Sequence, residues 1–435
     1  MSSSYHETIN WLFGLQKFGI KLGLENIIRL LELLGNPQKS LRCIHIAGTN
    51  GKGSTAAYLH SIYCRAGYRP GMFTSPHLVD FTERIVIGGV PINPEEVTAL
   101  VDHVRSVCRI YKLEHITFFE FITALALMYF ARHKADPVIL ETGMGGRLDA
   151  TNIVSPLISI LTSVSLEHTA HLGPTLLHIT REKAGIIKKG RPCISAVTRP
   201  GPRDCIRRIC HDKGSKLFEY GRDFSIRLLA DGYSYRDDSS RINALQPGLA
   251  GRHQATNAAL AITAVRYLRT AGYPLQDADV CSGVRSCFWP GRLESIQSHS
   301  RCIVLDGAHN PASWRTLERA LKNDFSYRRL VLVLGVMGDK NIRSLLQLAA
   351  KVHTCIFFQP AIERSADRQH LEKYVVFSEK KRVFWCETIV EALANALSKT
   401  TQQDLICITG SLFAVGEARE QLCGSGTDVS GRIGL

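Results

Sequence analysis

The chain has 435 residues, of which 45% are hydrophobic and 21% are charged. This composition is typical of a globular protein with a large core, and it excludes a disordered, collagen-like or disulfide-held chain. The length predicts about two or three domains. The net charge of +14 is typical of proteins that bind nucleic acid or attract a small polyanion. Because the basic residues are dispersed, we favour the small polyanion and expect no nucleic-acid partner.

The sequence predicts neither a membrane span nor a secretion signal. The most apolar stretch, Ile116 to Phe130, is interrupted by Glu120 and Thr123 and is interpreted as a buried helix. The N-terminus lacks a basic segment followed by an apolar one. The 13 cysteines show no metal-binding spacing, as expected for reduced thiols in a core. We therefore expect a cytoplasmic protein with no membrane partner.

Short apolar runs alternate with helical patterns along most of the chain. Helical spacing is clear in segments such as 54–66, 118–129 and 257–269. Strands separated by helices predict mostly parallel sheets that are buried on both faces. The strand candidates, in chain order, are 43–47, 137–141, 157–161, 302–306, 330–335, 354–358 and 405–409.

The alternation falters between residues 218 and 247, where polar, hairpin-like sequence predicts an antiparallel edge of the first sheet. A Pro-Gly-Arg turn at 290–292 precedes a new strand–helix series. The predicted fold is therefore α/β: an N-terminal P-loop-type domain with a mostly parallel sheet and helices on both faces, then a smaller, C-terminal Rossmann-like domain. We place these domains at 1–297 and 298–423, and expect 424–435 to be a disordered tail.

The strongest functional signal lies between the first predicted strand and the helix that follows it. Glycines there let backbone N–H groups approach a phosphate, and the helix N-terminus favours an anion. Lys52 adds a positive charge, and a hydroxyl group of Ser54 or Thr55 can reach Mg²⁺. The spacing departs from the full G-x-x-x-x-G-K-[ST] pattern, so a merely tight turn is the alternative. The predicted nucleotide-binding residues are Gly48, Thr49, Asn50, Gly51, Lys52, Gly53, Ser54 and Thr55.

This loop resembles the phosphate loop of the Mur ligase superfamily, and other motifs resemble the folylpolyglutamate synthase / dihydrofolate synthase family. The similar segments occur in order along nearly the whole chain. One position departs from the family pattern, because Glu167 stands where an aspartate usually precedes the histidine. The similar segments are 21–27, 74–78, 83–85, 140–152, 166–169, 181–188, 251–257, 289–292 and 305–311.

The resemblance implies an ATP-dependent ligase that adds L-glutamate to dihydropteroate, to the γ-carboxylate of reduced folates, or to both. A carboxylate of the substrate would take the γ-phosphate to give an acyl phosphate, which the amino group of glutamate then attacks. Such phosphoryl transfer needs charge neutralisation and positioning from the protein. The family also implies Mg²⁺ as a cofactor and a monomeric protein.

The resemblance makes Glu141, Ser75 and His168 ligands of Mg²⁺, and Ser54 of the phosphate loop is the fourth residue assigned to the metal. From the residues alone, the alternative for Glu141 is an ion-paired strand end, and His168 would be interpreted as a hydrogen-bonded loop histidine. Lys183 would by itself be interpreted as a solvated helix lysine. In the family the corresponding lysine is carbamylated, and the resemblance therefore implies that Lys183 helps to hold a metal ion.

The resemblance places further contacts with the nucleotide on the far side of a cleft, at Asn257, Arg292, Asp306 and His309. An Asp-Gly turn is a common loop element, which is the structural alternative for Asp306. If both domains supply ligands, their closure would assemble the site and exclude water. The residues assigned to catalysis are Lys52, Lys183, Asp306 and His309.

Two further segments are expected to contact the other substrates. The loop at 74–78, together with Arg84, resembles the family's substrate loop and would face the pterin. Ser411 follows a predicted strand and opens a helix, so it is either an N-cap or a contact for an anion. The residues assigned to substrate binding are Thr74, Ser75, Pro76, His77, Arg84 and Ser411.

Two other functions remain open from the sequence. A cell-wall Mur ligase would share the phosphate loop, but it would be expected to have an additional N-terminal domain for its UDP-linked substrate. A non-catalytic nucleotide switch or a basic nucleic-acid-binding protein would not need Glu141, His168, Lys183 and Asp306 together.

Overall fold

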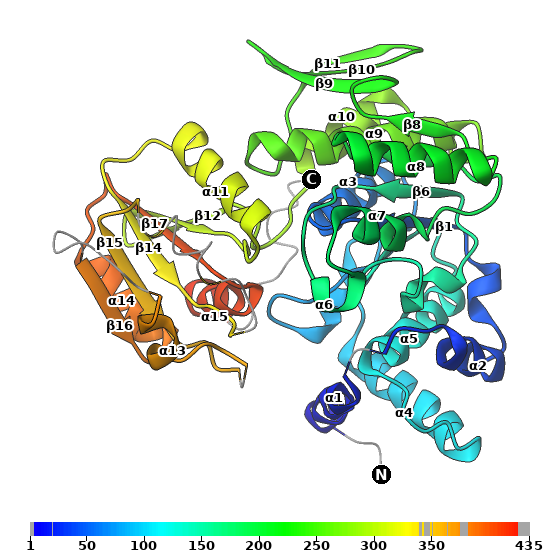
Figure 1. Ribbon diagram of the computed structural model, residues 1–435, viewed down its shortest axis with the longest axis horizontal. Helices are drawn as coiled ribbons and strands as arrows, with labels where there is room; N and C mark the ends of the chain where they lie inside the picture. Colours follow the sequence, from blue (N-terminus) through cyan, green and yellow to red (C-terminus); the bar gives the residue numbers. More distant parts are fainter. Residues whose placement is uncertain are drawn as a thin grey trace. The chain divides into compact units, whose positions relative to one another are not determined.

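The computed structural model describes residues 4–19, 21–338, 342, 349, 351–362, 364–374 and 382–424. The chain divides into two compact units (Figure 1). The first comprises Met1–Gly248 and Gln254–Cys287, and the second comprises Leu249–His253 and Phe288–Leu435. Apart from Gly424, the tail predicted at 424–435 lies outside the described residues.

The first unit is built on an eight-stranded sheet of order β4-β3-β2-β5-β1-β6-β7-β8. In this spatial order, each strand from β2 to β8 is parallel to the next one. At the other edge, β3 is antiparallel to β2, and β4 is antiparallel to β3. The strands are β1 (Cys43–Ala47), β2 (Gly71–Phe73), β3 (Ile85–Ile87), β4 (Val90–Pro91), β5 (Val138–Glu141), β6 (Ile158–Leu161), β7 (Cys193–Ser195) and β8 (Leu217–Glu219).

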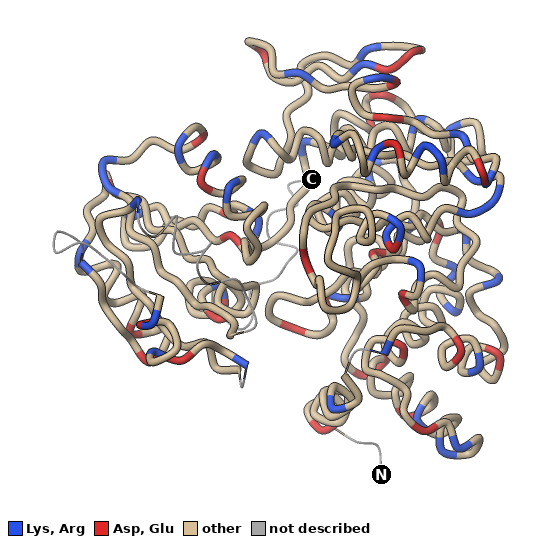
Figure 2. Tube along the Cα trace, viewed as in Figure 1, with Lys and Arg blue, Asp and Glu red and all other residues tan. Residues whose placement is uncertain are grey.

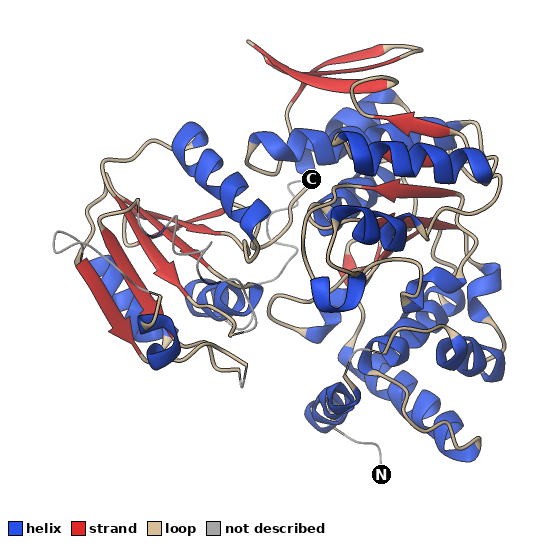
Figure 3. Ribbon diagram, in the orientation of Figure 1, coloured by secondary structure: helices blue, strands red, loops and turns tan. Residues whose placement is uncertain are grey.

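Helices pack on both faces of this sheet (Figure 3), as the nearly continuous apolar strands require. The α-helices are α1 (Tyr5–Gly14), α2 (Glu25–Leu33), α3 (Lys52–Arg65), α4 (Pro94–Ile110), α5 (Phe118–Arg132), α6 (Thr169–Leu172), α7 (Leu176–Ala184), α8 (Pro200–Asp212), α9 (Arg252–Arg269) and α10 (Asp277–Ser286). The 3₁₀ helices are η1 (Leu15–Phe18), η2 (Pro37–Ser40), η3 (Phe81–Arg84) and η4 (Ala150–Ile153).

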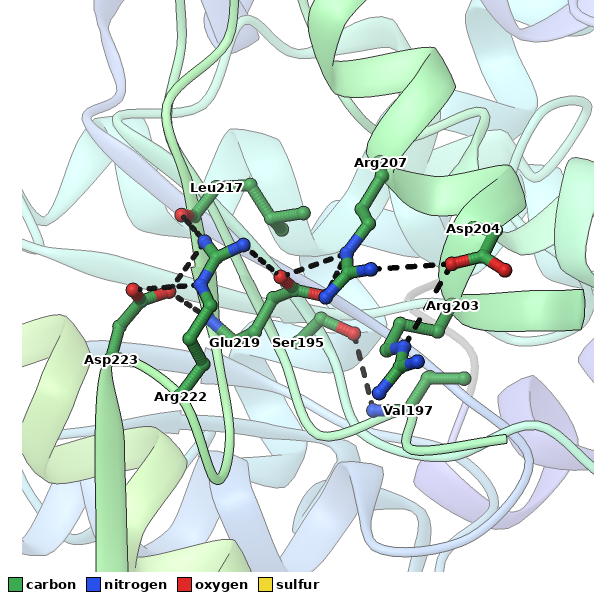
Figure 4. Close-up of polar contacts among 9 residues, drawn as sticks. All are labelled: Ser195, Val197, Arg203, Asp204, Arg207, Leu217, Glu219, Arg222 and Asp223. Atoms are coloured by element: carbon green, nitrogen blue, oxygen red, sulfur yellow. Dashed lines mark hydrogen bonds and ion pairs between the residues drawn. The ribbon is translucent and has the colours of Figure 1, made fainter. Parts of the chain in front are cut away.

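The free edge of β8 is held by charged side chains (Figure 4). Glu219, the last residue of β8, is buried and accepts hydrogen bonds from Nε of Arg207 at 2.9 and 3.0 Å. Arg222 forms a second ion pair with the same carboxylate. Arg207 lies on α8, so these contacts fasten that helix to the edge of the sheet.

The prediction that residues 218–247 form an edge of the first sheet is wrong. The strands β9 (Phe224–Leu229), β10 (Gly232–Asp237) and β11 (Arg241–Leu245) form a separate antiparallel sheet. The edge of the large sheet is already occupied by β8, which pairs in parallel with β7. The small sheet buries an apolar face of its own, where Tyr235 hydrogen-bonds Thr263 of α9 at 2.9 Å.

The second unit contains a six-stranded sheet of order β12-β13-β17-β14-β15-β16, parallel except for β12. The strands are β12 (Glu294–Ser298), β13 (Arg301–Leu305), β14 (Leu330–Leu334), β15 (Thr354–Phe358), β16 (Arg382–Cys386) and β17 (Leu405–Thr409). The helices described there are α11 (Pro311–Asp324), α13 (Arg368–Glu372), α14 (Ile389–Ser398) and α15 (Leu412–Cys423). The predicted domain boundary at 297 falls within β12, which belongs to this sheet because it pairs with β13.

The α/β prediction of two sheet domains is confirmed, and the charge pattern agrees with the sequence. In each unit, Lys and Arg are interspersed with Asp and Glu along the tube in Figure 2. None of the helices in the described part of the chain combines the length and the apolar character needed to cross a membrane.

Candidate active site

The phosphate loop connects β1 to α3, as the sequence predicts. Gly51 has φ of 88° and directly precedes the helix, which begins at Lys52. This positive φ favours glycine. The side chains of Ser54 and Thr55 are buried in the first turn. The first N–H groups of a helix have no partners within the helix, so this turn can bind an anion.

The loop is held from the side by the segment that follows β6. Thr49 N–H donates to the carbonyl oxygen of Ser163 at 2.8 Å, and Asn50 N–H donates to Ser163 Oγ at 3.0 Å. The backbone N–H groups of Thr49 and Asn50 therefore already have acceptors. This role of Ser163 was not predicted. The only signal for it in the sequence is the group of hydroxyl residues Thr162, Ser163 and Ser165 directly after a strand.

Two positions of the loop must be glycine, because neighbouring side chains leave no room for a Cβ atom. A Cβ atom at Gly48 would lie 1.8 Å from Oγ1 of Thr162, and one at Gly51 would lie 2.5 Å from Oδ1 of Asn257. Asn257 belongs to α9 in the first unit. The expectation that it reaches the nucleotide from the far side of a cleft is therefore wrong, since Asn257 packs directly against the phosphate loop.

Opposite charges meet where β5 ends. Glu141, the last residue of β5, is 5% exposed and lies beside Ile46 of β1. Its Oε1 atom lies 3.7 Å from Nζ of Lys52, and its Oε2 atom accepts the N–H of Ser75 at 3.2 Å. Glu141 is thus an ion-paired strand end, and the structure brings it together with the phosphate loop and the predicted substrate loop.

Lys183 is buried beneath the same loop. It lies on α7, is 4% exposed, and donates from Nζ to the carbonyl oxygen of Gly48 at 2.8 Å. Burial lowers its pKa to about 7, and the positive charge of Lys52 contributes to this shift. The interpretation of Lys183 as a solvated lysine is wrong, because packing of α7 against the sheet removes this position from water.

The loop after Glu141 is clamped onto the helix that carries Lys183. Arg147 N–H donates to the carbonyl oxygen of Glu182 at 2.7 Å, and its guanidinium group donates to Oε1 of Glu182 at 3.1 and 2.9 Å. A Cβ atom at Gly146 would lie 2.8 Å from the carbonyl oxygens of Glu182 and Lys183. These contacts set the spacing between Glu141 and Lys183, and none of them was predicted from the sequence.

The predicted substrate loop is arranged around a buried arginine. Arg84 is 7% exposed, and its Nε donates to Nδ1 of His77 at 2.8 Å. Its guanidinium group lies 6.0 Å from the ring centre of Phe81 and 5.4 Å from that of Phe118. Burial and the charge of Arg84 lower the pKa of His77 to about 3, so this imidazole is neutral and donates only from Nε2. Thr74 N–H closes the loop by donating to the carbonyl oxygen of Arg84.

Two other predicted site residues of this region are both exposed. Pro76 is exposed in the substrate loop. His168, expected at the metal, is exposed directly before α6 and has φ of 49°. The neighbouring Glu167 raises the pKa of Lys183, against the stronger opposing effect of burial. Among the residues that the structure describes, no three His, Cys, Asp or Glu side chains are grouped so that they could hold a metal ion.

In the second unit, Asp306 follows β13 and is buried. Its Oδ2 accepts Leu293 N–H and its Oδ1 accepts Ala308 N–H, both at 3.0 Å. Burial raises the pKa of Asp306, while Arg292 and these N–H groups oppose the shift. Asp306 thus organises the turn that also carries His309, whose Nδ1 lies 2.8 Å from the carbonyl oxygen of Gly307.

Ser411 is the N-cap of α15, which confirms the capping alternative for this residue. Its Oγ accepts the N–H of Ala414 at 3.0 Å. This bond satisfies one of the free donors in the first turn of the helix. The capping contact fixes Ser411 at the carboxyl end of β17, in the same sheet as Asp306.

The fold and this phosphate loop are those of a Mur ligase. The Mur ligase middle domain matches residues 46–265, and the Mur ligase, glutamate ligase domain matches residues 291–412. The two matches cover the phosphate loop, Glu141 and Lys183 in one domain, and Arg292, Asp306 and Ser411 in the other.

Whole-chain relatives define the family more narrowly. The chain is 36% identical to the dihydrofolate synthase/folylpolyglutamate synthase of Bacillus subtilis, over 97% of this chain and 100% of the relative. The folylpolyglutamate synthase of Thermotoga maritima has a similar structure, with a TM-score of 0.82, 32% identity, and 98% of each chain covered. Escherichia coli FolC, solved in complex with DHPP and ADP, gives a TM-score of 0.84 at 30% identity, covering 95% of this chain and 97% of that one. The chain belongs to the dihydrofolate synthase/folylpolyglutamate synthase family and is an ATP-dependent ligase.

Proposed function

We propose that this ligase joins L-glutamate to dihydropteroate and to the γ-carboxylate of reduced folates, with ATP as the energy source. The observation that carries the proposal is the group formed by half-buried Lys52 and by buried Glu141 and Lys183 against the phosphate loop. Charges of both signs are costly to bury without a charged ligand. The triphosphate of ATP and its metal ion would supply that ligand.

The chemistry follows in two steps. A carboxylate oxygen of the folate-type substrate attacks the γ-phosphorus, and the bond from that phosphorus to ADP breaks. The amino nitrogen of glutamate then attacks the acyl carbon, loses a proton, and displaces phosphate to leave an amide. Lys52 neutralises charge that develops on the phosphoryl oxygens, and the first-turn N–H groups of α3 hold the phosphates in line.

The residues present fit a Mg²⁺ ion held largely by substrate oxygens. Mg²⁺ is usually bound by one or two carboxylates together with phosphates and water. Glu141 supplies the carboxylate, the hydroxyls of Ser54 and Ser75 are further candidates, and His168 remains a proposed ligand. The metal ion would draw charge away from the γ-phosphate during transfer.

Lys183 is proposed to be carbamylated, as the family resemblance implies. Only a neutral amine attacks carbon dioxide, and the product is an anionic carbamate plus a proton. The lowered pKa of Lys183, about 7, supports this because a substantial fraction of the amine is neutral near neutral pH. A carbamate would replace the ammonium next to Lys52 with a group of opposite charge.

The other assignments are proposals for the second unit and for the substrate loop. Arg292, Asp306 and His309 would contact the nucleotide, and Ser411 an anionic group of a substrate. Thr74, Ser75, Pro76, His77 and Arg84 would contact the pterin. We propose a cytoplasmic monomer with no nucleic-acid or membrane partner.

The decisive experiment measures ADP release by the purified protein with Mg-ATP and L-glutamate, comparing dihydropteroate with tetrahydrofolate. Activity with both acceptors would support the bifunctional enzyme, and activity with one would identify which half of the reaction it performs. The absence of glutamate-dependent ADP release with either acceptor, in protein that binds Mg-ADP, would contradict the proposal.

A further inference from the structure

Ser163 binds the phosphate loop through both its backbone and its side chain. Its carbonyl oxygen accepts Thr49 N–H at 2.8 Å. Its hydroxyl group accepts Asn50 N–H at 3.0 Å and donates to the carbonyl oxygen of Asn50 at 2.9 Å. The hydroxyl therefore uses its donor and one acceptor position on a single residue of the loop.

The residues on either side of Ser163 continue this pattern. Thr162 Oγ1 also donates to the carbonyl oxygen of Asn50, at 2.7 Å. Oγ1 of Thr49 accepts Ser165 N–H at 3.0 Å and donates to the carbonyl oxygen of Ser165 at 3.3 Å. The first half of the phosphate loop is thus built against the segment after β6, and its polar groups are directed into the protein.

This arrangement divides the loop into two parts. The N–H groups of Thr49 and Asn50 are occupied by Ser163 and are not directed at a ligand. The N–H groups of the first turn of α3, which begins at Lys52, have no acceptors within the helix. A bound phosphate must therefore be held by the second part, whose orientation depends on how firmly the first part is fixed.

We propose that Ser163 is a positioning residue for the nucleotide. It holds Thr49 and Asn50 so that the N–H groups at the start of α3 face the phosphates of ATP. This inference rests on the proposed function only for the identity of the ligand as a nucleotide. Ser163 itself touches no phosphate, and its effect passes through the backbone of Asn50.

The test compares Mg-ADP binding by calorimetry in the wild type and in Ser163→Ala and Ser163→Thr variants. Ser163→Ala leaves Asn50 N–H without its acceptor, and we expect it to weaken Mg-ADP binding about tenfold. Ser163→Thr retains the hydroxyl, and we expect it to bind within about threefold of the wild type. Under turnover, Ser163→Ala should raise the KM for ATP and leave the KM for the folate substrate unchanged.

Ser61→Ala is the matched control. Ser61 lies on α3, the same helix, and its Oγ donates to the carbonyl oxygen of Gly283 at 2.7 Å. It loses a hydrogen bond of similar geometry away from the loop, so its nucleotide binding should match that of the wild type. If Ser163→Ala binds Mg-ADP as the wild type does, the inference is wrong. Equal weakening in both alanine variants, with equal losses in Tm, would also overturn it.

The binding assay contains neither folate nor glutamate, which separates this inference from the proposed function. A wild type that binds Mg-ADP but shows no ligase activity would contradict the proposed function alone. A wild type with full ligase activity, together with a Ser163→Ala variant of unchanged Mg-ADP affinity, would contradict the positioning role alone.

Discussion

The carboxyl ends of the strands are organised differently in the two units. In the large sheet, the start of α3 and the last residue of β5 bring Lys52 and Glu141 together, with Lys183 buried against the phosphate loop. In the six-stranded sheet, Asp306 is held by backbone N–H groups of Leu293 and Ala308. In the large sheet, charged side chains are grouped so that a charged ligand can bind to them. In the six-stranded sheet, backbone N–H groups hold a single carboxylate in place.

This difference predicts where substitutions act. Removing a charge from this group should affect the reaction more than the fold, because in the proposed function these side chains act on the triphosphate of ATP and its metal ion. Removing Asp306 should affect both, since its carboxylate is an acceptor for two backbone donors. Four variants or conditions test this, in order of decreasing expected effect.

Lys52→Ala should have the largest effect. The loss of positive charge at the phosphate loop should raise the barrier to phosphoryl transfer by about 3 kcal/mol or more, and so lower kcat by at least about 100-fold. Glutamate-dependent ADP release measures this, and circular dichroism checks that the variant is folded. Turnover close to that of the wild type would mean that the phosphate loop is wrongly assigned.

Asp306→Ala should lower both activity and stability. It leaves Leu293 N–H and Ala308 N–H without their acceptors, at a cost of about 2–3 kcal/mol in the stability of the second unit. We expect a protein that remains folded, with a lower unfolding midpoint in urea and reduced kcat. An unchanged kcat would show that Asp306 has only the structural role of its turn.

Lowering the pH should weaken the first unit through its buried histidines. Burial lowers the pKa of His45 to about 3 and that of His60 to about 4. The unfolded chain, with histidine pKa values near 6.5, therefore binds more protons, and stability falls as the pH falls from 6.5 toward 4. Each histidine should contribute a loss of about 2 kcal/mol by pH 5.

Urea unfolding of the wild type and of His60→Gln at pH 7 and pH 5 checks this effect. The variant should lose less stability between the two pH values, because it lacks one of the groups that must take up a proton. An identical pH dependence in the two proteins would contradict the neutral, buried state of His60.

Arg147→Met should have the smallest effect. Because the side chain of Arg147 is 56% exposed, its ion pair with Glu182 adds about 1 kcal/mol or less to stability. Its position between the Glu141 loop and Lys183 should nevertheless lower kcat, by about tenfold. Arg29→Met, which removes an exposed Arg–Glu pair in α2, is the matched control and should leave kcat unchanged. Equal kcat values for the two variants would show that Arg147 does not position the site.

The fold was predictable where a strand is long and buried on both faces. The apolar runs of β1, β14, β15 and β17 mark their positions closely. The strands β2, β7 and β8 have 3 residues each, which is too short for a periodic pattern to emerge. The hairpin at 218–247 was recognised as antiparallel, but its sheet was not, because pairing partners depend on which edges are already occupied.

The site was predictable where its residues lie within one motif. The phosphate loop follows a strand and Glu141 ends one, so their chemistry can be inferred locally. Ser163 and Asn257 contact the phosphate loop, and Glu182 contacts the loop after Glu141, from distant parts of the sequence. A single sequence shows no pairing between such segments, and the burial of Lys183 likewise depends on tertiary packing and not on its helical neighbours.

The close approach of Gly48 to Thr162 has a consequence for how this sequence can vary. A Cβ atom at position 48 would lie only 1.8 Å from the threonine hydroxyl, so Gly48 cannot be exchanged while Thr162 is kept. An exchange of Gly48 should therefore be found only together with a change at position 162. A side chain at position 48 first requires the loss of the hydroxyl at position 162. That loss also removes the hydrogen bond from Thr162 to the carbonyl oxygen of Asn50, which helps to shape the loop.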